Sequence, residues 1–341
     1  MKSLSLVSII LPVYNVEGYI KECLDSLVNQ TYTPIEIIAV NDGSTDGSLS
    51  ILASYAKHHT CISIITQNNK GLSCARNNGL DAARGTYILF VDSDDVVAPS
   101  LVQRCVEAFQ KHNSEMLLFN HATFETSDGN LIQRTKNLKN GPTGITDFLN
   151  IATSLKSDTW YPVCWYAFRK YFLDKYNLRF YEGILHEDIL FTPTALNFAK
   201  ELTIVPEVLY HYRKRPGSIT TDPQKAAQSL KDHWFIAHQL YELSQNTTDN
   251  ERKSVLEKLV AKRYKFILEQ CEKSHIGFPQ NFYRDIVKSI LSKRNITRQY
   301  SLEFYYKYLE TPRQRSRRIC FENLTKWPRR IYKFQIKPFF K

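Results

Sequence analysis

Several features are scarce or missing in this 341-residue sequence. It contains no uninterrupted apolar run of about 18 residues, so we expect no membrane-spanning helix. Its seven cysteines are scattered and none forms a CxxC pair, which argues against a zinc site and against a disulfide framework. The N-terminal segment has no small-residue cleavage site, so it does not resemble a signal peptide. Together these absences favour a protein of the reducing cytoplasm.

The positive charge of the chain is concentrated at one end. The formal net charge is +11, yet residues 311–341 contain ten lysines and arginines against a single acidic residue, Glu322. No nucleic-acid-binding motif accompanies this charge, so we expect no nucleic acid partner. Aromatic side chains such as Trp327 and Phe340 are interleaved with the basic ones, which suits an anionic lipid surface. We therefore expect peripheral attachment to the cytoplasmic face of the inner membrane, with a solvated basic tail as the alternative.

The first hundred residues alternate between two kinds of pattern. Short apolar, β-branched runs predict strands at 6–14, 35–42, 61–67 and 86–92. The segments between them carry apolar residues at helical spacing, as in residues 17–30. Strands that alternate with helices favour an α/β fold with a mostly parallel sheet and helices on both faces. From about residue 225 onward the pattern is helical.

Polar residues gather where each predicted strand ends. They are Pro12, Tyr14 and Glu17 after the first strand, Asp42 after the second, Lys70 after the third, and Asp92, Ser93 and Asp94 after the fourth. Ligands of open α/β sheets bind beyond the carboxyl ends of the strands. Because these ends meet at one edge of a parallel sheet, the sequence predicts a single site there.

The acidic turn after the fourth strand is a candidate metal site. Asp92 and Asp94 lie two residues apart, and carboxylate oxygens are the ligands that Mg²⁺ and Mn²⁺ prefer. A divalent cation would balance carboxylates that otherwise repel each other. The alternative is a solvated turn in which Ser93 or Asp95 caps a helix.

Three further residues among the first hundred have both a functional and a structural interpretation. Asp42 could accept a hydrogen bond from a nucleobase N–H or a ribose hydroxyl, or could form an Asx-turn. Lys70 could contact a phosphate, or could be an exposed loop lysine. Asn77 lies on a short helix near the predicted site, where it could bind the ligand or be a simple helix-face amide.

Two adjacent carboxylates, Glu187 and Asp188, follow a segment that is rich in aromatic residues. Burial beside aromatic rings and a second carboxylate would raise the pKa of such a group and make it a usable general base. The alternative is that the two residues only complement the N-terminal dipole of the helix that follows.

The stretch "YHYRKRPGSIT" supplies a last group of candidates. Arg213 and Arg215 could clamp diphosphate oxygens, with Ser218 beside them, and His211 could complete a metal shell. An ordinary basic loop that contains a buried histidine is the alternative.

Four ordered stretches resemble one enzyme family. They are "VSIILPVYNVEGYIKECLDSLVNQTYTPIEIIAVNDGSTDGS", "NKGLSCARNNGLDAARGTYILFVDSDD", "LHEDILF" and "YHYRKRPGSIT". Together they look like glycosyltransferase family 2, and the likeness covers roughly residues 6–220. The resemblance implies a GT-A fold, that is, a Rossmann-like α/β sheet with helices on both faces, followed here by a C-terminal helical region.

The resemblance also implies a domain organisation and site roles. Residues 1–222 would form the catalytic domain, with a nucleotide-binding half over 1–100 and an acceptor-side half over 101–222. A helical region over 223–310 and the basic aromatic tail over 311–341 would follow. The nucleotide-sugar site would comprise Pro12, Tyr14, Glu17, Asp42, Lys70, Asn77, Asp92, Ser93, Arg213, Arg215 and Ser218.

The chemistry that the resemblance implies is an inverting displacement on a nucleotide-diphosphate sugar, with UDP-hexose or UDP-N-acetylhexosamine favoured. Asp188, with Glu187 beside it, would be the general base. Asp94 and His211 would hold Mn²⁺ or Mg²⁺, which would neutralise the leaving diphosphate.

The sequence lacks the QxxRW element of processive members of this family, so we expect transfer of one sugar at a time. The expected acceptor is a hydroxyl of a glycan or a lipid-linked glycan in surface polysaccharide synthesis. A nucleotidyltransferase, or a basic protein that binds nucleic acid or membrane, is the alternative function.

Overall fold

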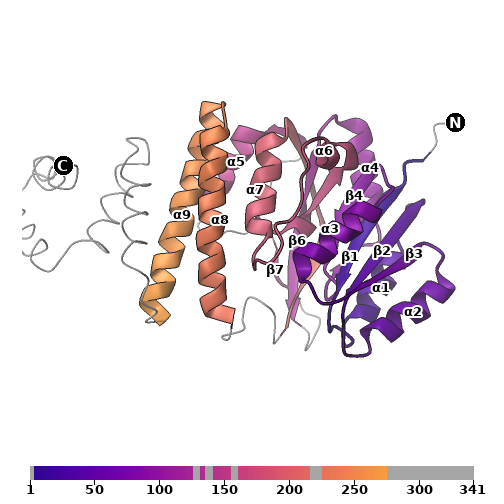
Figure 1. The fold of residues 1–341 in the computed structure, drawn as a ribbon. Coiled ribbons are helices and arrows are strands. Elements are labelled where there is room, and N and C mark those ends of the chain that lie inside the picture. Colours follow the sequence, from indigo (N-terminus) through magenta and orange to yellow (C-terminus); the bar gives the residue numbers. More distant parts are fainter. Residues whose placement is uncertain (1–3, 126–130, 135–140, 155–159, 216–224, 275–341) are drawn as a thin grey trace, which may run out of the picture. The chain divides into compact units, whose positions relative to one another are not determined.

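The structure is a computed structural model that describes residues 4–125, 131–134, 141–154, 160–215 and 225–274 (Figure 1). The chain divides into two compact units, residues 1–259 and 260–341. All of the elements described below belong to the first unit, apart from the C-terminal part of the last helix. In the second unit only Val260–Ser274, the C-terminal part of one helix, is described. No helix within the described residues is long and apolar enough to cross a bilayer.

The four strands expected in the first hundred residues all form. They are β1 (Val7–Val13), β2 (Ile35–Asp42), β3 (Ile62–Gln67) and β4 (Tyr87–Phe90). They lie in the order β3-β2-β1-β4, and every neighbouring pair is parallel. The residues of β1 are buried throughout, as a parallel strand covered on both faces requires. The near-continuous apolar runs in the sequence therefore predicted this part of the sheet correctly.

The second half of the sheet is mixed rather than parallel. Beyond β4 the order continues through β9 (Tyr166–Arg169), β6 (Met116–Glu125), β10 (Glu201–Lys214) and β5 (Val96–Val97), with β7 (Leu131–Arg134) on β6 and β8 (Gly141–Gly144) on β10. Strand β9 runs antiparallel to both β4 and β6, whereas β10 is parallel to β6. The aromatic-rich sequence around β9 lacks a clear period, so the sequence did not predict this strand.

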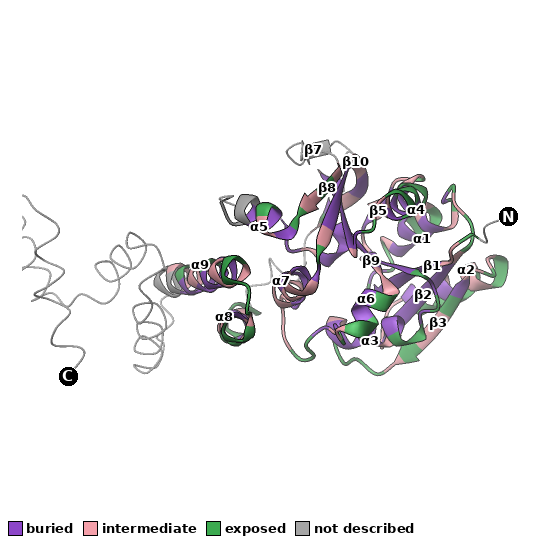
Figure 2. Cartoon of the chain, turned by 90° about the horizontal axis from the view of Figure 1, so that it is seen from above, coloured by how far each residue is buried: buried purple, intermediate pink, exposed green. Residues whose placement is uncertain are grey.

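Helices cover both faces of the sheet. The first four are α1 (Ile20–Val28), α2 (Ser48–His58), α3 (Leu72–Ala82) and α4 (Leu101–Lys111). Figure 2 shows α1 and α4 on one side of the strands and α3 on the other. The remaining elements are α5 (Ile145–Ser154), a short 3₁₀ turn (Val163–Trp165), α6 (Lys170–Lys175), α7 (Asp188–Phe198), α8 (Ala226–Asn246) and α9 (Asn250–Ser274). The expected α/β class is therefore confirmed, and α8 and α9 lie where the sequence turns helical.

Helix α3 lies unusually close to the sheet. A Cβ atom added to Gly79 would be only 2.5 Å from Ile10 Cγ2 on β1, so a side chain at this position would push the helix outward. The close approach places the first turn of α3 beside the carboxyl ends of β1 and β2. Gly79 is therefore part of what positions the site described below.

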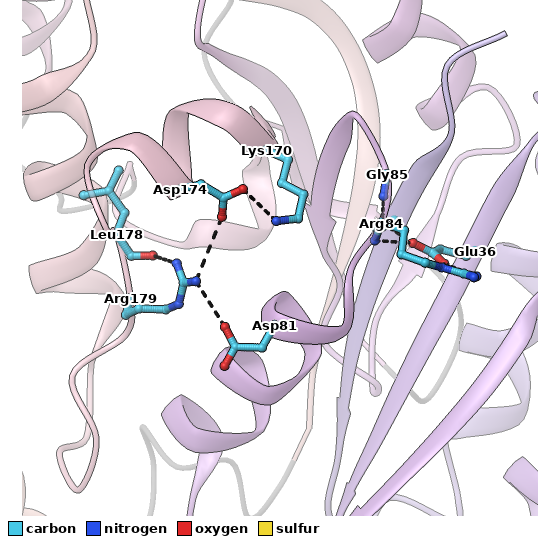
Figure 3. Close-up of polar contacts among 9 residues, drawn as sticks. Glu36, Asp81, Arg84, Gly85, Lys170, Asp174, Leu178 and Arg179 are labelled. Atoms are coloured by element: carbon cyan, nitrogen blue, oxygen red, sulfur yellow. Dashed lines mark hydrogen bonds and ion pairs between the residues drawn. The ribbon is translucent and has the colours of Figure 1, made fainter. Parts of the chain in front are cut away.

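The opposite end of α3 is fastened by two ionic clusters (Figure 3). Arg179 NH2 lies 3.1 Å from Asp81 Oδ1 at the end of α3. On the strand side, the buried carboxylate of Glu36 accepts hydrogen bonds from the backbone N–H of Arg84 at 2.7 Å and from Ser8 Oγ at 2.6 Å. The Arg84 guanidinium also contacts Glu36 Oε2, at 2.8 Å.

Burial raises the pKa of Glu36, but the hydrogen bonds from Ser8 and Arg84 outweigh it and hold the pKa below its usual value. The stabilisation from Glu36 is therefore present above the unfolded-state pKa, and it is lost as the pH falls through the lowered folded-state pKa.

We expect Glu36→Ala to lower the free energy of unfolding by about 1–3 kcal/mol, because it leaves buried donors on Ser8 and Arg84 without their acceptor. Urea denaturation at pH 7 measures this loss. The matched control is Glu107→Ala, which removes an exposed carboxylate paired with Arg104 and should change the stability very little. Equal effects of the two variants would contradict a structural role for Glu36.

Candidate active site

A cavity of about 800 Å³ opens at the carboxyl ends of β1, β2 and β4. Its walls come from several parts of the first unit. The N-terminal half contributes residues that follow each strand and the first turn of α3. The segment before α7 contributes residues 183–187, and the end of β10 contributes Tyr212 with Arg215 just after it. Gln228 and Asp232 come from α8, and Lys225 directly precedes that helix. The single site predicted at this edge of the sheet is thus a real concavity.

The cavity brings together most of the residues that the sequence singled out. Its lining includes Pro12, Tyr14, Asp42, Lys70, Asp92, Ser93, Asp94, Glu187 and Arg215. The lining does not include Glu17, Asn77, Asp188, His211 or Arg213. Ser218 lies outside the described residues.

Arg76 joins the two acidic groups of the site. The Nη2 atom of this buried arginine of α3 lies 2.6 Å from Asp92 Oδ1, and its Nη1 atom pairs with Glu187 Oε1. Burial alone would lower the pKa of the guanidinium, but Asp92 and Glu187 raise it above its usual value. Arg76 is therefore a fixed positive charge, and it ties the end of β4 to the start of α7.

The turn that carries Asp92 and Asp94 is anchored beneath by Asp95 and Tyr210. Asp95 is fully buried and accepts hydrogen bonds from Tyr210 Oη at 2.6 Å and from the Arg213 backbone N–H at 2.7 Å. The backbone N–H of Asp92 donates in turn to Tyr210 Oη, at 3.2 Å. Burial, reinforced by Asp94 and Asp92, raises the pKa of Asp95 well above its usual range. Asp95 is therefore a structural support, whereas Asp92 and Asp94 line the cavity.

Arg213, in β10, and Arg215, directly after β10, have different surroundings. Arg215 Nε lies 2.6 Å from Asp94 Oδ2 in the cavity wall. Arg213 is buried, donates from Nε to the Asp94 carbonyl at 2.8 Å, and pairs with Glu22 on α1. Its guanidinium also lies 4.5 Å from the centre of the Phe124 ring. Arg213 thus holds the turn in place, whereas Arg215 lines the cavity.

Asp42 lines the cavity and also shapes its wall. Its Oδ1 accepts hydrogen bonds from the Lys70 backbone N–H at 2.8 Å and from Gln67 Nε2 at 2.7 Å. Its Oδ2 accepts from the Gly71 backbone N–H at 2.9 Å. The Asx-turn that the sequence left open does not form here, because Asp42 bonds to the loop after β3 rather than to its own turn.

Two other candidates make contacts of a structural kind. Glu17 accepts a hydrogen bond from the Gly47 backbone N–H at 2.6 Å, at the start of α2. Asn77 exchanges two hydrogen bonds of 2.9 Å with the backbone of Phe180. It thereby fastens the segment before Glu187 to α3.

His211 lies within β10, where it pairs in register with Val96 of β5 and Ala122 of β6. Burial lowers the pKa of its ring, which favours the neutral form. A neutral ring is the form that binds metals, but His211 is not part of the cavity lining.

Asp188 is the first residue of α7 and is half-buried. Burial raises its pKa to about 7, with a further contribution from Glu187 and a smaller one from Asp92, against the opposing charge of Arg76. A carboxylate with a pKa near neutrality can accept a proton at physiological pH.

A divalent cation fits the donors that face the cavity. Asp92 and Asp94 present carboxylate oxygens there, which is the donor type that Mg²⁺ and Mn²⁺ take. A second group, Asp92, Asp95 and Cys164, lies within 4.8 Å, but Asp95 and Cys164 are buried and burial raises the pKa of the Cys164 thiol. The Asp92 and Asp94 pair is therefore the better match for a hard cation.

Comparison with known proteins identifies the family. The family model "Glycosyl transferase family 2" matches residues 8–176. Glycosyltransferase YibD of Escherichia coli (strain K12), which is uncharacterized, is 30% identical over 256 residues, covering 73% of this chain and 74% of YibD. This chain belongs to glycosyl transferase family 2. The resemblance seen in the sequence motifs is thereby confirmed.

Two further comparisons bear on this family 2 chain. It is 40% identical over 225 residues to uncharacterized glycosyltransferase EpsJ of Bacillus subtilis (strain 168), a match that spans 65% of each protein. The crystal structure of S. aureus TarS residues 1–349 with UDP-GlcNAc superposes with a TM-score of 0.66 and 21% identity, covering 84% of this chain and 80% of TarS 1–349. At that identity the likeness supports the fold, and it confirms the expected GT-A architecture.

Two residues of this family 2 site could not be assigned from the sequence. For Arg76, which lies on the same short helix as Asn77 near the predicted site, the sequence leaves a role in the site and a surface arginine equally open, because nothing local shows that two distant carboxylates flank it. Tyr210 and His211 are neighbours on β10, where Tyr210 is buried and His211 is half-buried, and no local pattern of the sequence distinguishes the two.

We expect Arg76→Met to lower the free energy of unfolding by about 3–5 kcal/mol, because it leaves Asp92 and the buried Glu187 without their counter-charge. Adding Glu187→Gln to Arg76→Met should restore part of this loss, and denaturant unfolding of the single and double variants measures the coupling. Arg104→Met, at an exposed ion pair, is the control. Strictly additive effects of the two substitutions would show that Arg76 does not depend on Glu187.

Proposed function

We propose that this protein is an inverting glycosyltransferase that moves one sugar from a nucleotide-diphosphate sugar to an acceptor hydroxyl. The observation that carries the proposal is the convergence of Asp92, Asp94 and Glu187 on one cavity, with Asp188 next to Glu187 at the start of α7. A cavity of about 800 Å³ has room for a nucleotide and a sugar.

A UDP-hexose or UDP-N-acetylhexosamine is the donor we favour. The binding of UDP-GlcNAc by TarS, which shares the fold, supports this choice. In this arrangement Pro12, Tyr14 and Asp42 surround the nucleoside, and Asp92 faces the ribose. Lys70 and Arg215 supply positive charge to the diphosphate. Arg215 would have to exchange its pairing with Asp94 for contact with the diphosphate oxygens.

Asp94, with Asp92, would hold Mn²⁺ or Mg²⁺. When bound, the cation supplies the positive charge that stabilises the departing diphosphate. The chain's own residues do the rest. Arg76 holds Asp92 and Glu187 in place through its two ion pairs. Asp188 is not part of the cavity lining, so it would have to turn toward the cavity to act. There it would take the proton of the acceptor hydroxyl as the hydroxyl oxygen attacks the anomeric carbon from the side opposite the diphosphate. A single displacement of this kind inverts the configuration.

Asp188 is suited to the role of general base because the neighbouring carboxylate, Glu187, forms the ion pair with Arg76 instead. Glu187 stays paired with Arg76, and its negative charge helps to raise the pKa of Asp188. The two adjacent carboxylates therefore have different environments, which is what separates a general base from a structural ion.

The acceptor we propose is a glycan or a lipid-linked glycan in surface polysaccharide synthesis. Attachment of the basic tail, residues 311–341, to the cytoplasmic membrane face would bring the site to such an acceptor. The tail lies outside the described residues, so this part stays a prediction from sequence.

We expect Asp188→Asn to lower kcat by about 10²–10⁴-fold, because the amide cannot accept the proton. The affinity for the nucleotide sugar should stay nearly unchanged.

For the unaltered protein kcat should rise with pH and level off above about 7, since the base must be deprotonated. Release of nucleoside diphosphate over a panel of nucleotide sugars measures the rate. Release of pyrophosphate instead would indicate the alternative, a nucleotidyltransferase.

We expect Asp94→Ala to weaken both UDP binding and turnover, without rescue by excess Mn²⁺, because the variant lacks a donor to the cation. Calorimetric titration with UDP, with and without Mn²⁺, measures binding. Asp81→Ala, an exposed residue at the far end of α3, is the control. If Asp94→Ala bound UDP and Mn²⁺ as tightly as the unaltered protein, the metal assignment would be wrong.

A further inference from the structure

The turn that leads into Asp188 has an unusual backbone. Gly183 and His186 both have positive φ, of 80° and 61°. Glycine adopts this conformation readily, but for a residue with a side chain such as His186 it is uncommon. A turn of this kind needs support from its surroundings to hold one conformation.

Helix α8 supplies that support through a carboxylate. Asp232 is 4% exposed, and its Oδ2 accepts a hydrogen bond from the Leu185 backbone N–H at 2.9 Å. Its Oδ1 accepts from Gln228 Nε2, one helical turn earlier, at 2.8 Å. Gln228 therefore orients the carboxylate, and the carboxylate fixes the turn three residues before Asp188.

The side chain of His186 is held by the same helix. Its Nε2 lies 2.8 Å from Ser229 Oγ, and its ring stacks on His233 with the centroids 4.6 Å apart and the planes 9° from parallel. Burial lowers the pKa of His186, and burial together with His186 lowers the pKa of His233 to about 3. Both rings are thus neutral near pH 7, which lets them stack without repulsion.

We propose that Asp232 is a positioning residue for the general base: from α8 it fixes the Leu185–His186 turn and so sets where the Asp188 carboxylate lies. Helix α8 is then part of the catalytic apparatus. Both oxygens of Asp232 accept hydrogen bonds from the protein, one of them from the turn, and these contacts suit it to orient the turn. Asp232 also lines the cavity. This inference rests on the proposed role of Asp188.

The first test uses Asp232→Ala and measures amide hydrogen exchange. We expect peptides that contain Leu185 to exchange at least about tenfold faster than in the unaltered protein, while peptides from β1 exchange at the same rate. Glu242→Ala, an exposed acidic residue on the same helix, should leave both unchanged. Asp232→Asn keeps one oxygen acceptor and should lie closer to the unaltered protein. Unchanged exchange at Leu185 in Asp232→Ala would overturn the inference, whatever the activity.

The second test measures kinetics. Displacement of the base should lower kcat of Asp232→Ala by about 10–100-fold, with KM for the nucleotide sugar within about twofold of the unaltered protein. Because burial is the main cause of the raised pKa of Asp188, a loosened turn should also shift the rising limb of kcat to lower pH. A purely structural loss would lower the melting temperature without moving this limb, and that result would also overturn the inference.

The two proposals fail in different ways. If Asp188→Asn stayed active, the proposed role of Asp188 would be wrong, yet faster exchange at Leu185 in Asp232→Ala would still report the link to α8. If Asp188→Asn were inactive and Asp232→Ala kept the unaltered kcat and pH profile, the general base would stand and the positioning role of Asp232 would fall.

Discussion

The buried guanidinium of Arg76 is the contact on which the site depends. It lies on α3 and pairs with Asp92 at the end of β4 and with Glu187 at the start of α7. Without it, two carboxylates would face each other across a partly desolvated cavity. The same charge opposes the rise in the pKa of Asp188 that burial and Glu187 cause. One arginine thus joins the two halves of the fold and moderates the basicity of the proposed base.

A second layer of contacts supports this centre. Tyr210 and Asp95 hold the acidic turn, Arg213 closes it against α1, and Asp232 holds the turn before Asp188. Buried polar groups of this kind are costly unless every one is paired. The hydrogen bonds of these buried residues fix the positions of the two turns that carry the proposed reacting groups.

Part of the fold and part of the site could be predicted from sequence, because they depend on patterns within short segments of the chain. Near-continuous apolar runs fix the parallel strands, and Asp42, Asp92 and Asp94 follow those strands directly, so their shared edge was predictable. Strand β9 was not, because its aromatic-rich segment has no clear period. Asn77 and Arg213 were expected to bind the nucleotide sugar, yet their contacts are with backbone and neighbouring side chains. A local pattern does not show whether an amide or a guanidinium faces the ligand or the protein.

The sequence by itself determined the family, the α/β class and the placement of Asp42, Asp92 and Asp94 at one edge of the sheet, because motifs and strand ends are local in the chain. The tertiary structure alone decided which charges meet. Arg76 and Glu187 are 111 residues apart, and Leu185 and Asp232 are 47 apart, so no local pattern links them. The pKa of Asp188 depends on burial and on neighbours brought together only by folding, and its basicity is therefore a property of the fold.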